Sequence, residues 1–320
     1  MNDLGGARVL VTGASGFVGR PLCVGLTEAG CTVRAVSRAP SALAWAGDVH
    51  PVAGIDGHTD WDTALVGVSA VVHLAARVHR LSDDAPDAAA AYERVNTAGT
   101  LRLAAAAAAA GCRRFVFLST VKVLGEAGRF RGEGAGQPPA DPYGLSKYDA
   151  EQGLRRIAET SGMKVVCLRP PLVYGPGVKA NFLRLMNWVH CGLPLPLGAV
   201  KNRRSLVYVG NLVDAIVRCL TADSVPGFAY SVTDGDDVST AELIRRIGRA
   251  MGKPARLIRC PVRILNWGGA LTGKGAEVHR LVQDLAVTYD AFCTDFDWTP
   301  PFTMDKGIQE TVDWYMDNRN

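Results

Sequence analysis

The chain has 320 residues, of which 48% are hydrophobic and 21% carry a charge, so it can bury a large core as one or two closely packed domains. Its formal net charge is only +4, and it contains no dense block of Lys and Arg. A nucleic-acid partner is therefore disfavoured.

The cysteines and the apolar runs indicate where the protein works. The eight cysteines are scattered and form no C-x-x-C pair, so we expect small buried side chains in a reducing compartment and no metal site. The N-terminus does not resemble a signal peptide, and no apolar run reaches the roughly 18 residues that span a bilayer. These features predict a cytoplasmic protein without an integral membrane segment. Residues 261–271 could dip into a membrane surface, but Arg263 and the short length favour packing in the core.

Strand-like and helix-like segments alternate along the first half of the chain. Apolar, β-branched runs occur at residues 8–12, 32–36, 70–74, 115–119 and 164–169. The alanine-rich residues 101–110 end at Gly111, which is typical of a helix followed by its C-terminal glycine. The alternation predicts an α/β fold of Rossmann type, a doubly wound parallel sheet covered by helices on both faces.

Gly and Pro clusters become frequent from about Gly175 onward. We therefore predict a first domain of Rossmann type in residues 1–174, built on the parallel sheet. Residues 175–320 should form mainly a smaller C-terminal α/β substrate-binding domain, interleaved with the first because some segments return to the sheet.

A glycine-rich loop follows the first predicted strand and precedes a helix. Glycines here let the backbone turn sharply and approach a pyrophosphate at the helix N-terminus, although loops also carry glycines for turns alone. The position between strand and helix favours a dinucleotide, with contacts from Gly13, Ser15, Gly16, Phe17, Val18 and Gly19.

The end of the second predicted strand bears on which dinucleotide is used. An acidic residue there would bind the adenosine ribose hydroxyls, whereas a basic residue accommodates a 2′-phosphate. This chain has Ser37 and Arg38 and no acid. NADP(H) is thus favoured and NAD(H) remains possible, since Arg38 could equally be a solvated surface residue.

A tyrosine and a lysine lie near the start of a predicted helix. Asp141 is a suitable N-cap and Pro142 a suitable first residue, so Tyr143 and Lys147 share one face, four residues apart. A nearby ammonium would lower the pKa of the phenol and make it a general acid or base. The alternative is a packed tyrosine and an unrelated surface lysine. Two hydroxyls, of Ser119 and Thr120, end the fourth predicted strand.

Together, the G-x-x-G-x-x-G loop, the strand-end hydroxyls and the Y-x-x-x-K pair resemble the extended short-chain dehydrogenase/reductase family of the NAD-dependent epimerase/dehydratase type. The resemblance covers nearly the whole chain and implies that Thr120, Tyr143 and Lys147 are catalytic. It implies further cofactor contacts from Asp56, Leu74, Ala75, Ala76, Ser119, Tyr143, Lys147 and Pro170. It implies substrate contacts from Asn96, Ser119, Thr120, Lys122, Tyr143, Asn181 and Arg204. One departure is Ile55, which stands where the family has an adenine-contacting acid, with Asp56 as a neighbouring substitute.

The resemblance also bears on the reaction. Sugar 4,6-dehydratases of this family have an Asp-Glu pair after the catalytic threonine, and Val121 and Lys122 stand here instead, which disfavours dehydration. The acid-free second strand favours a reductase. So does the similarity of residues 118–126 and 174–182 to bacterial surface-polysaccharide enzymes that reduce UDP-4-keto-6-deoxy-N-acetylhexosamines.

Two alternatives remain open. One is a UDP-hexose 4-epimerase with tightly bound NAD, and the other is a non-catalytic NADP-binding regulator. A UDP-sugar substrate and a possible homodimer are implied by the resemblance alone.

Overall fold

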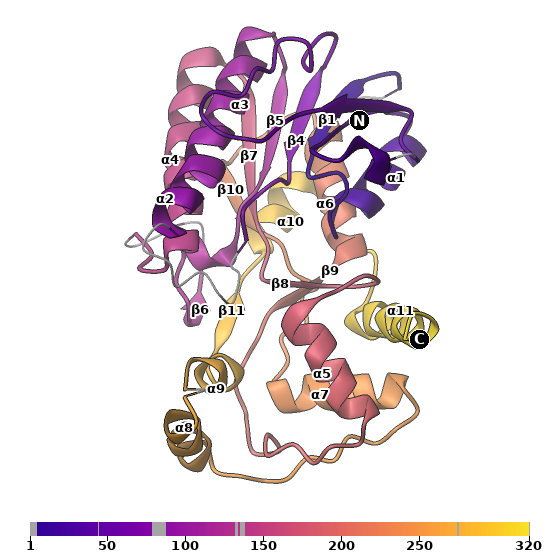
Figure 1. Cartoon of the computed structure of the whole chain (residues 1–320), viewed down its shortest axis with the longest axis vertical. Helices are drawn as coiled ribbons and strands as arrows, with labels where there is room; N and C mark the ends of the chain where they lie inside the picture. Colours follow the sequence, from indigo (N-terminus) through magenta and orange to yellow (C-terminus); the bar gives the residue numbers. More distant parts are fainter. Residues whose placement is uncertain are drawn as a thin grey trace.

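A parallel sheet forms the upper part of the computed structural model, which describes residues 5–43, 45–78, 88–131, 134, 138–273 and 275–319 (Figure 1). Its seven strands have the order β10-β7-β5-β4-β1-β2-β3. The α/β class and the Rossmann-type parallel sheet are confirmed, and each of the five predicted runs matches a strand to within one residue at either end. The strands are β1 (Arg8–Thr12), β2 (Thr32–Ser37), β3 (Asp48–Pro51), β4 (Ala70–His73), β5 (Arg114–Leu118), β7 (Lys164–Arg169) and β10 (Ala229–Ser231).

Helices cover both faces of the sheet because successive strand side chains point to opposite sides. In the hydrophobic core clusters, Leu10 and Phe115 pack with α3 and α4, whereas Val9 and Val116 pack with α1 and α6. Burial on both faces explains why the strands read as continuous apolar runs. The helices of these two layers are α1 (Gly19–Glu28), α2 (Ala88–Tyr92), α3 (Gly99–Ala109), α4 (Pro142–Ser161), α6 (Val209–Thr221) and α10 (Asp290–Phe296).

Two helix ends follow the predicted capping. Helix α3 gives way to Gly111, whose φ of 79° is a left-handed conformation that glycine adopts readily. Helix α4 begins after Asp141, whose carboxylate accepts the backbone N–H of Gly144 at 2.9 Å, with Pro142 at the first position. This cap fixes Tyr143 in the first turn of α4.

A second hydrophobic core lies beyond the carboxyl ends of the strands, where the chain continues directly from β7 into β8 (Figure 1). Its elements are β8 (Leu172–Tyr174) paired with β9 (Leu206–Tyr208), and α5 (Ala180–His190), α7 (Thr240–Ala250) and α11 (Met304–Asp317). Strand β6 (Gly128–Phe130) pairs with β11 (Leu285–Val287), near helices α8 (Val262–Leu271) and α9 (Gly275–Val282). Strand β10 pairs with β7 in the main sheet. The boundary at residue 174 stays a prediction.

Two expectations from the sequence hold only in part. Helix α8 was expected to pack in the core, and Val262 and Leu265 do pack against the second hydrophobic core, but Gly269 is its only buried residue among those described. Cys191 is exposed, and Cys260 and Cys293 are half-buried, while the other five cysteines are buried as expected. Within the described ranges, no helix has both the length and the apolar character needed to cross a membrane.

Candidate active site

The ends of β1 and β4 are joined by a buried polar chain. The Thr12 hydroxyl accepts the backbone N–H of Ala75 at 3.2 Å and lies 2.6 Å from Nδ1 of His73. Nε2 of His73 lies 3.0 Å from the Thr100 hydroxyl. Complete burial lowers the pKa of His73 to about 3, so the ring is neutral at working pH. This histidine fixes the glycine-rich loop against the segment with the half-buried Leu74, Ala75 and Ala76.

The glycine-rich loop approaches its surroundings too closely for side chains. Gly13 has φ 70°, and a Cβ there would lie 2.8 Å from the backbone nitrogen of Ala75. A Cβ on Gly19 would overlap the carbonyl oxygen of Gly13. In the described structure no side chain caps α1 at Val18, which leaves backbone N–H groups at its N-terminus available to an anion. The loop therefore fits a dinucleotide pyrophosphate.

The residues expected at the adenosine end make local contacts. The Ser37 hydroxyl donates to the carbonyl of Ala39 and accepts its N–H, each at 3.1 Å. The Asp56 carboxylate accepts the N–H of His58 at 2.9 Å, and that bond lowers the pKa of Asp56. Arg38 is exposed. Contacts from these residues to a cofactor stay predictions.

Lys147 lies inside the protein, which rules out the alternative of a surface lysine. Its side chain is 1% exposed, and Nζ donates to the carbonyl of Leu118 at 2.8 Å. Nζ also lies 4.3 Å from the centroid of the Phe117 ring. Burial lowers the pKa of Lys147 to about 7, although the charge of Glu151 opposes the shift. An ammonium has three N–H donors, so a group bonded to one carbonyl can also donate to hydroxyl groups such as those of a ribose.

Tyr143 is half-buried, and its acidity differs from the sequence prediction. Burial, with smaller contributions from the charge of Asp141 and the neighbouring Tyr92, raises the pKa of Tyr143 to about 12. The prediction of a lowered pKa is wrong for the protein by itself, because desolvation is the largest cause of the shift and opposes ionisation of the phenol. The protein alone therefore holds Tyr143 as a neutral phenol.

Thr120 lies at the turn that follows β5. Its hydroxyl caps the short helix η3 (Val121–Val123) by accepting the N–H of Lys122 at 3.3 Å. Nζ of Lys122 binds the Asp141 carboxylate at 3.0 Å and lies 5.8 Å from the centroid of the Tyr143 ring. This ion pair ties the turn that carries Thr120 to the start of α4.

The sequence reading missed Glu151. This carboxylate is fully buried; it accepts the Ser119 hydroxyl at 2.5 Å and binds the Arg169 guanidinium at 2.5 and 3.0 Å. A signal was present, because Tyr143, Lys147 and Glu151 recur every four residues and so form one stripe along α4. Since the Ser119 hydroxyl is bonded to Glu151, its contacts with cofactor and substrate stay predictions.

Asn96 connects the end of β4 to α4. Its Oδ1 accepts the N–H of Arg77 at 2.8 Å, and its Nδ2 donates to the carbonyl of Arg77 at 3.0 Å and to the Ser146 hydroxyl at 3.1 Å. It lies in the π-helical turn η2 (Glu93–Ala98) and is fully buried. These bonds give Asn96 a positioning role, and its contact with substrate stays a prediction.

Three further residues predicted to contact the cofactor or the substrate come from segments after α4. Pro170 is buried, and its carbonyl accepts the N–H of Val121 at 3.1 Å, which brings the end of β7 to the Thr120 turn. Asn181 is exposed at the start of α5, next to Ala180, which has the unusual φ of 54°. Arg204 is half-buried and donates to the carbonyl of Arg280 at 2.5 Å. Roles of Asn181 and Arg204 in binding substrate stay predictions.

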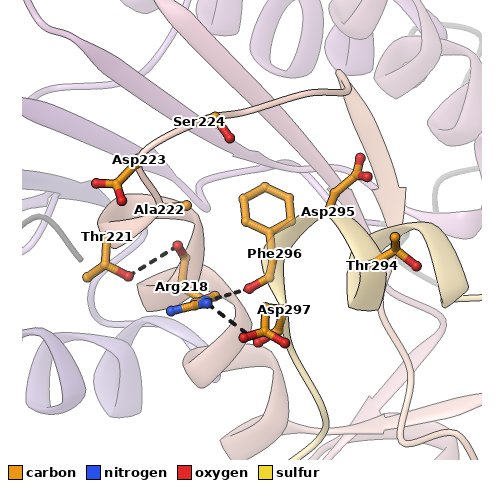
Figure 2. A pocket seen from close by; sticks show the side chains of 9 residues that line it. All are labelled: Arg218, Thr221, Ala222, Asp223, Ser224, Thr294, Asp295, Phe296 and Asp297. Atoms are coloured by element: carbon orange, nitrogen blue, oxygen red, sulfur yellow. Dashed lines mark hydrogen bonds between the residues drawn. The ribbon is translucent and has the colours of Figure 1, made fainter.

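A polar pocket of about 190 Å³ lies between the end of α6 and α10, away from the residues described above (Figure 2). Arg218 donates to the carbonyl of Phe296 at 2.6 Å across it. Arg114, the first residue of β5, donates to the carbonyl of Ala222 at the end of α6 at 2.9 Å. The pocket therefore adjoins the amino end of β5, whereas Thr120 follows its carboxyl end. Within the described ranges, no group of three or more His, Cys, Asp or Glu side chains could hold a metal.

Comparisons with known proteins agree with this geometry. A family model described as the NAD dependent epimerase/dehydratase family matches residues 9–232. A UDP-glucose 4-epimerase of Vibrio cholerae is 39% identical, over 98% of this chain and 96% of that relative. An N-acetyl-alpha-D-glucosaminyl-diphospho-ditrans,octacis-undecaprenol 4-epimerase of Escherichia coli O157:H7 is 27% identical, over 98% and 96%.

Solved structures of similar fold contain NAD or a sugar nucleotide. The UDP-glucuronic acid 4-epimerase of Bacillus cereus, in complex with NAD, aligns with a TM-score of 0.77 at 20% identity, over 98% of each chain. The UDP-glucose 4-epimerase of Thermotoga maritima, with UDP-glucose, aligns with a TM-score of 0.75 at 22% identity, over 98% of this chain and all of that one. At these identities the likeness shows a shared fold.

Proposed function

Because the chain belongs to the NAD-dependent epimerase/dehydratase family, we propose that it moves hydride at C4 of a sugar attached through a diphosphate. The observation that supports this best is the stripe on α4, where Lys147 is buried and Tyr143 is half-buried beside the turn after β5. A buried lysine is costly, and perturbed groups of this kind concentrate at functional sites.

The three predicted catalytic residues then have distinct roles. Tyr143 exchanges a proton with the oxygen on C4, and as a neutral phenol it acts as the acid when a 4-keto group is reduced. Thr120 donates a hydrogen bond to the same oxygen, which stabilises charge as it develops. Lys147 binds ribose hydroxyls of the dinucleotide. When bound, the nicotinamide accepts or gives the hydride, and its oxidised form carries a positive charge that lowers the pKa of a nearby phenol.

For the overall reaction, 4-epimerisation of a UDP-hexose with retained NAD is the better-supported form. Both relatives described above are named 4-epimerases, and they match the chain almost from end to end. Their named substrates share a sugar on a diphosphate, for which Arg204 and Asn181 are the candidate contacts.

A 4-keto reductase is the second candidate, and one observation favours it. Strand β2 ends at Ser37 and is followed by Arg38 with no acid, so an adenosine 2′-phosphate would meet no repulsion there. NADPH would then reduce a UDP-4-keto-6-deoxy-N-acetylhexosamine and leave as NADP. Dehydration lacks the acidic pair it requires, because Val121 and Lys122 occupy those positions.

The two reactions differ in what the purified protein carries. Denaturing the protein and identifying the released nucleotide should yield stoichiometric NAD for an epimerase, which then interconverts UDP-glucose and UDP-galactose without added cofactor. A reductase should release little nucleotide and consume NADPH when the 4-keto sugar is added. Failure with both kinds of substrate would contradict the proposal.

A conservative variant tests the role of the phenol. Tyr143→Phe should abolish turnover while leaving dinucleotide binding nearly intact, because only the hydroxyl is removed. Tyr148→Phe is the matched control, since Tyr148 is half-buried on the same helix and lies outside the Tyr143 stripe. Substantial turnover by Tyr143→Phe would refute the assigned role.

A further inference from the structure

Helix α8 presents apolar side chains to solvent along one stripe. Ile264, Trp267 and Leu271 are spaced i, i+3 and i+7, which places them on one side of a helix. They are 55%, 68% and 68% exposed, and Ile258 in the segment before the helix is 55% exposed. A single exposed apolar residue is ordinary, but a helical stripe that includes tryptophan is a feature of interaction surfaces.

The other side of α8 is anchored to the protein. Val262 and Leu265 pack against the second hydrophobic core. Gly269 is buried, and a Cβ there would lie 2.8 Å from Cγ2 of Val278 in α9. The inner side therefore holds the helix in place, and the outer stripe is free to make another contact.

Positive charge lies in the segment before the apolar stripe and in the first turn of α8. Residues 251–273 contain four basic side chains, Lys253, Arg256, Arg259 and Arg263, and no Asp or Glu. All four are exposed. In the part of the chain that the structure describes, none of the three arginines makes an ion pair. An anionic partner would therefore gain attraction here without displacing an existing pair.

We propose that this face of α8, with Ile258 and Arg259 before it, docks on the surface of an anionic lipid bilayer. Tryptophan and aliphatic side chains at the headgroup boundary, flanked by arginines that meet lipid phosphates, are the recognised chemistry of interfacial helices. Helix α8 also lies at the end of the molecule farthest from the main sheet, where a flat surface can reach it (Figure 1). This is surface docking and involves no spanning segment.

A second copy of the chain fits this face less well. A symmetric contact of the face with itself would place Arg259 and Arg263 of both copies in one interface, and an excess of like charge within an interface opposes association. The absence of acid from residues 251–273 gives such a contact no compensating partner within the face itself.

Vesicle flotation of the full chain tests the proposal. The protein should float with vesicles of phosphatidylcholine mixed with phosphatidylglycerol, bind vesicles of phosphatidylcholine alone more weakly, and dissociate as salt is raised. Trp267→Ser/Leu271→Ser should weaken binding by at least about tenfold. Ile264→Ser/Leu271→Ser provides a second variant if the first is unstable. Arg259→Glu/Arg263→Glu should weaken binding to the mixed vesicles in particular.

Trp45→Ser is the matched control, because Trp45 is 46% exposed and lies outside α8. It should leave flotation unchanged. Thermal unfolding of each variant and turnover of a water-dissolved sugar nucleotide should also be unchanged, so the result does not depend on which reaction the enzyme catalyses. The proposal is overturned if mixed vesicles are not bound, or if the α8 substitutions leave binding intact. It is also overturned if those substitutions only dissociate a dimer of the chain.

Discussion

Lys147→Met offers a quantitative test of the buried ammonium. Burial lowers the pKa of Lys147 from 10.5 to about 7. At about 1.4 kcal/mol per pKa unit, a charged lysine there costs the folded protein about 5 kcal/mol below pH 7. Methionine fits the same volume without a charge, but it leaves the carbonyl of Leu118 without its 2.8 Å donor, at a cost of about 1–3 kcal/mol. The variant should therefore be more stable by about 2–4 kcal/mol while losing turnover.

The gain should depend on pH in a defined direction. Below about pH 7 the lysine is protonated in both the folded and the unfolded chain, so the full cost of burial is present. Between pH 7 and 10.5 the folded protein loses the proton while the unfolded chain retains it, and the cost shrinks. The gain in stability of Lys147→Met over the parent protein should be largest near pH 7 or below. It should shrink above pH 7 and change sign towards pH 10.5, where only the loss of the hydrogen bond to Leu118 remains.

Thermal and urea unfolding across this pH range measure the difference. The unfolding temperature of Lys147→Met near pH 7 should rise by about 5 °C, on the order of 2 °C for each kcal/mol in a protein of this size. Lys122→Met is the control, because Lys122 is partly exposed and paired with Asp141, so its effect should stay near 1 kcal/mol or less. A Lys147→Met variant that is less stable than the parent protein near pH 7, or whose difference in stability does not change with pH, would refute the reasoning.

Three further substitutions test the surrounding structure. Glu151→Gln removes the carboxylate charge that pairs with the buried Arg169 guanidinium and should cost about 3–5 kcal/mol in urea unfolding. Adding Arg169→Met should recover part of the loss, and additive losses would contradict the coupling. Gly19→Ala places a methyl group against the carbonyl oxygen of Gly13 and should prevent the protein from retaining a dinucleotide. A purified variant that carries as much nucleotide as the parent protein would argue against this close approach. Asp141→Asn keeps the helix cap but removes a charge that raises the pKa of Tyr143, so the pH–activity profile should move to lower pH; an unmoved profile would show that Asp141 has no electrostatic effect on the phenol.

Much of the sheet could be predicted because its strands are buried on both faces. Residues 165–168 within the run 164–169 are apolar throughout, and the period of the helices between such runs is distinct. The cap at Asp141 and the glycine after α3 could also be predicted from the sequence, because they depend on local backbone chemistry. Helix α8 was misjudged for the opposite reason. Its composition is apolar, but composition does not reveal which side of a helix finds a partner.

The candidate site was predictable as a set of residues and not as a set of interactions. Spacing placed Tyr143 and Lys147 on one face, but it could not show that Lys147 would be fully buried and bonded to a backbone carbonyl. Glu151 lay on the same stripe and was overlooked, because a glutamate in a helix is usually solvated. Its partner Arg169 lies on a different strand, so their contact depends on the tertiary fold.

The electrostatics of the stripe bear on how one tyrosine can serve in both directions of a redox reaction. The protein alone keeps Tyr143 neutral, with a pKa of about 12, and it keeps Lys147 near half protonation at about pH 7. Both groups are thus sensitive to any charge that is bound beside them. A positive charge beside the phenol lowers its pKa and favours a base, and loss of that charge restores the acid. An alcohol needs the base for oxidation and a ketone needs the acid for reduction. Under the proposed function, the protonation state of Tyr143 would therefore follow the redox state of the bound nicotinamide.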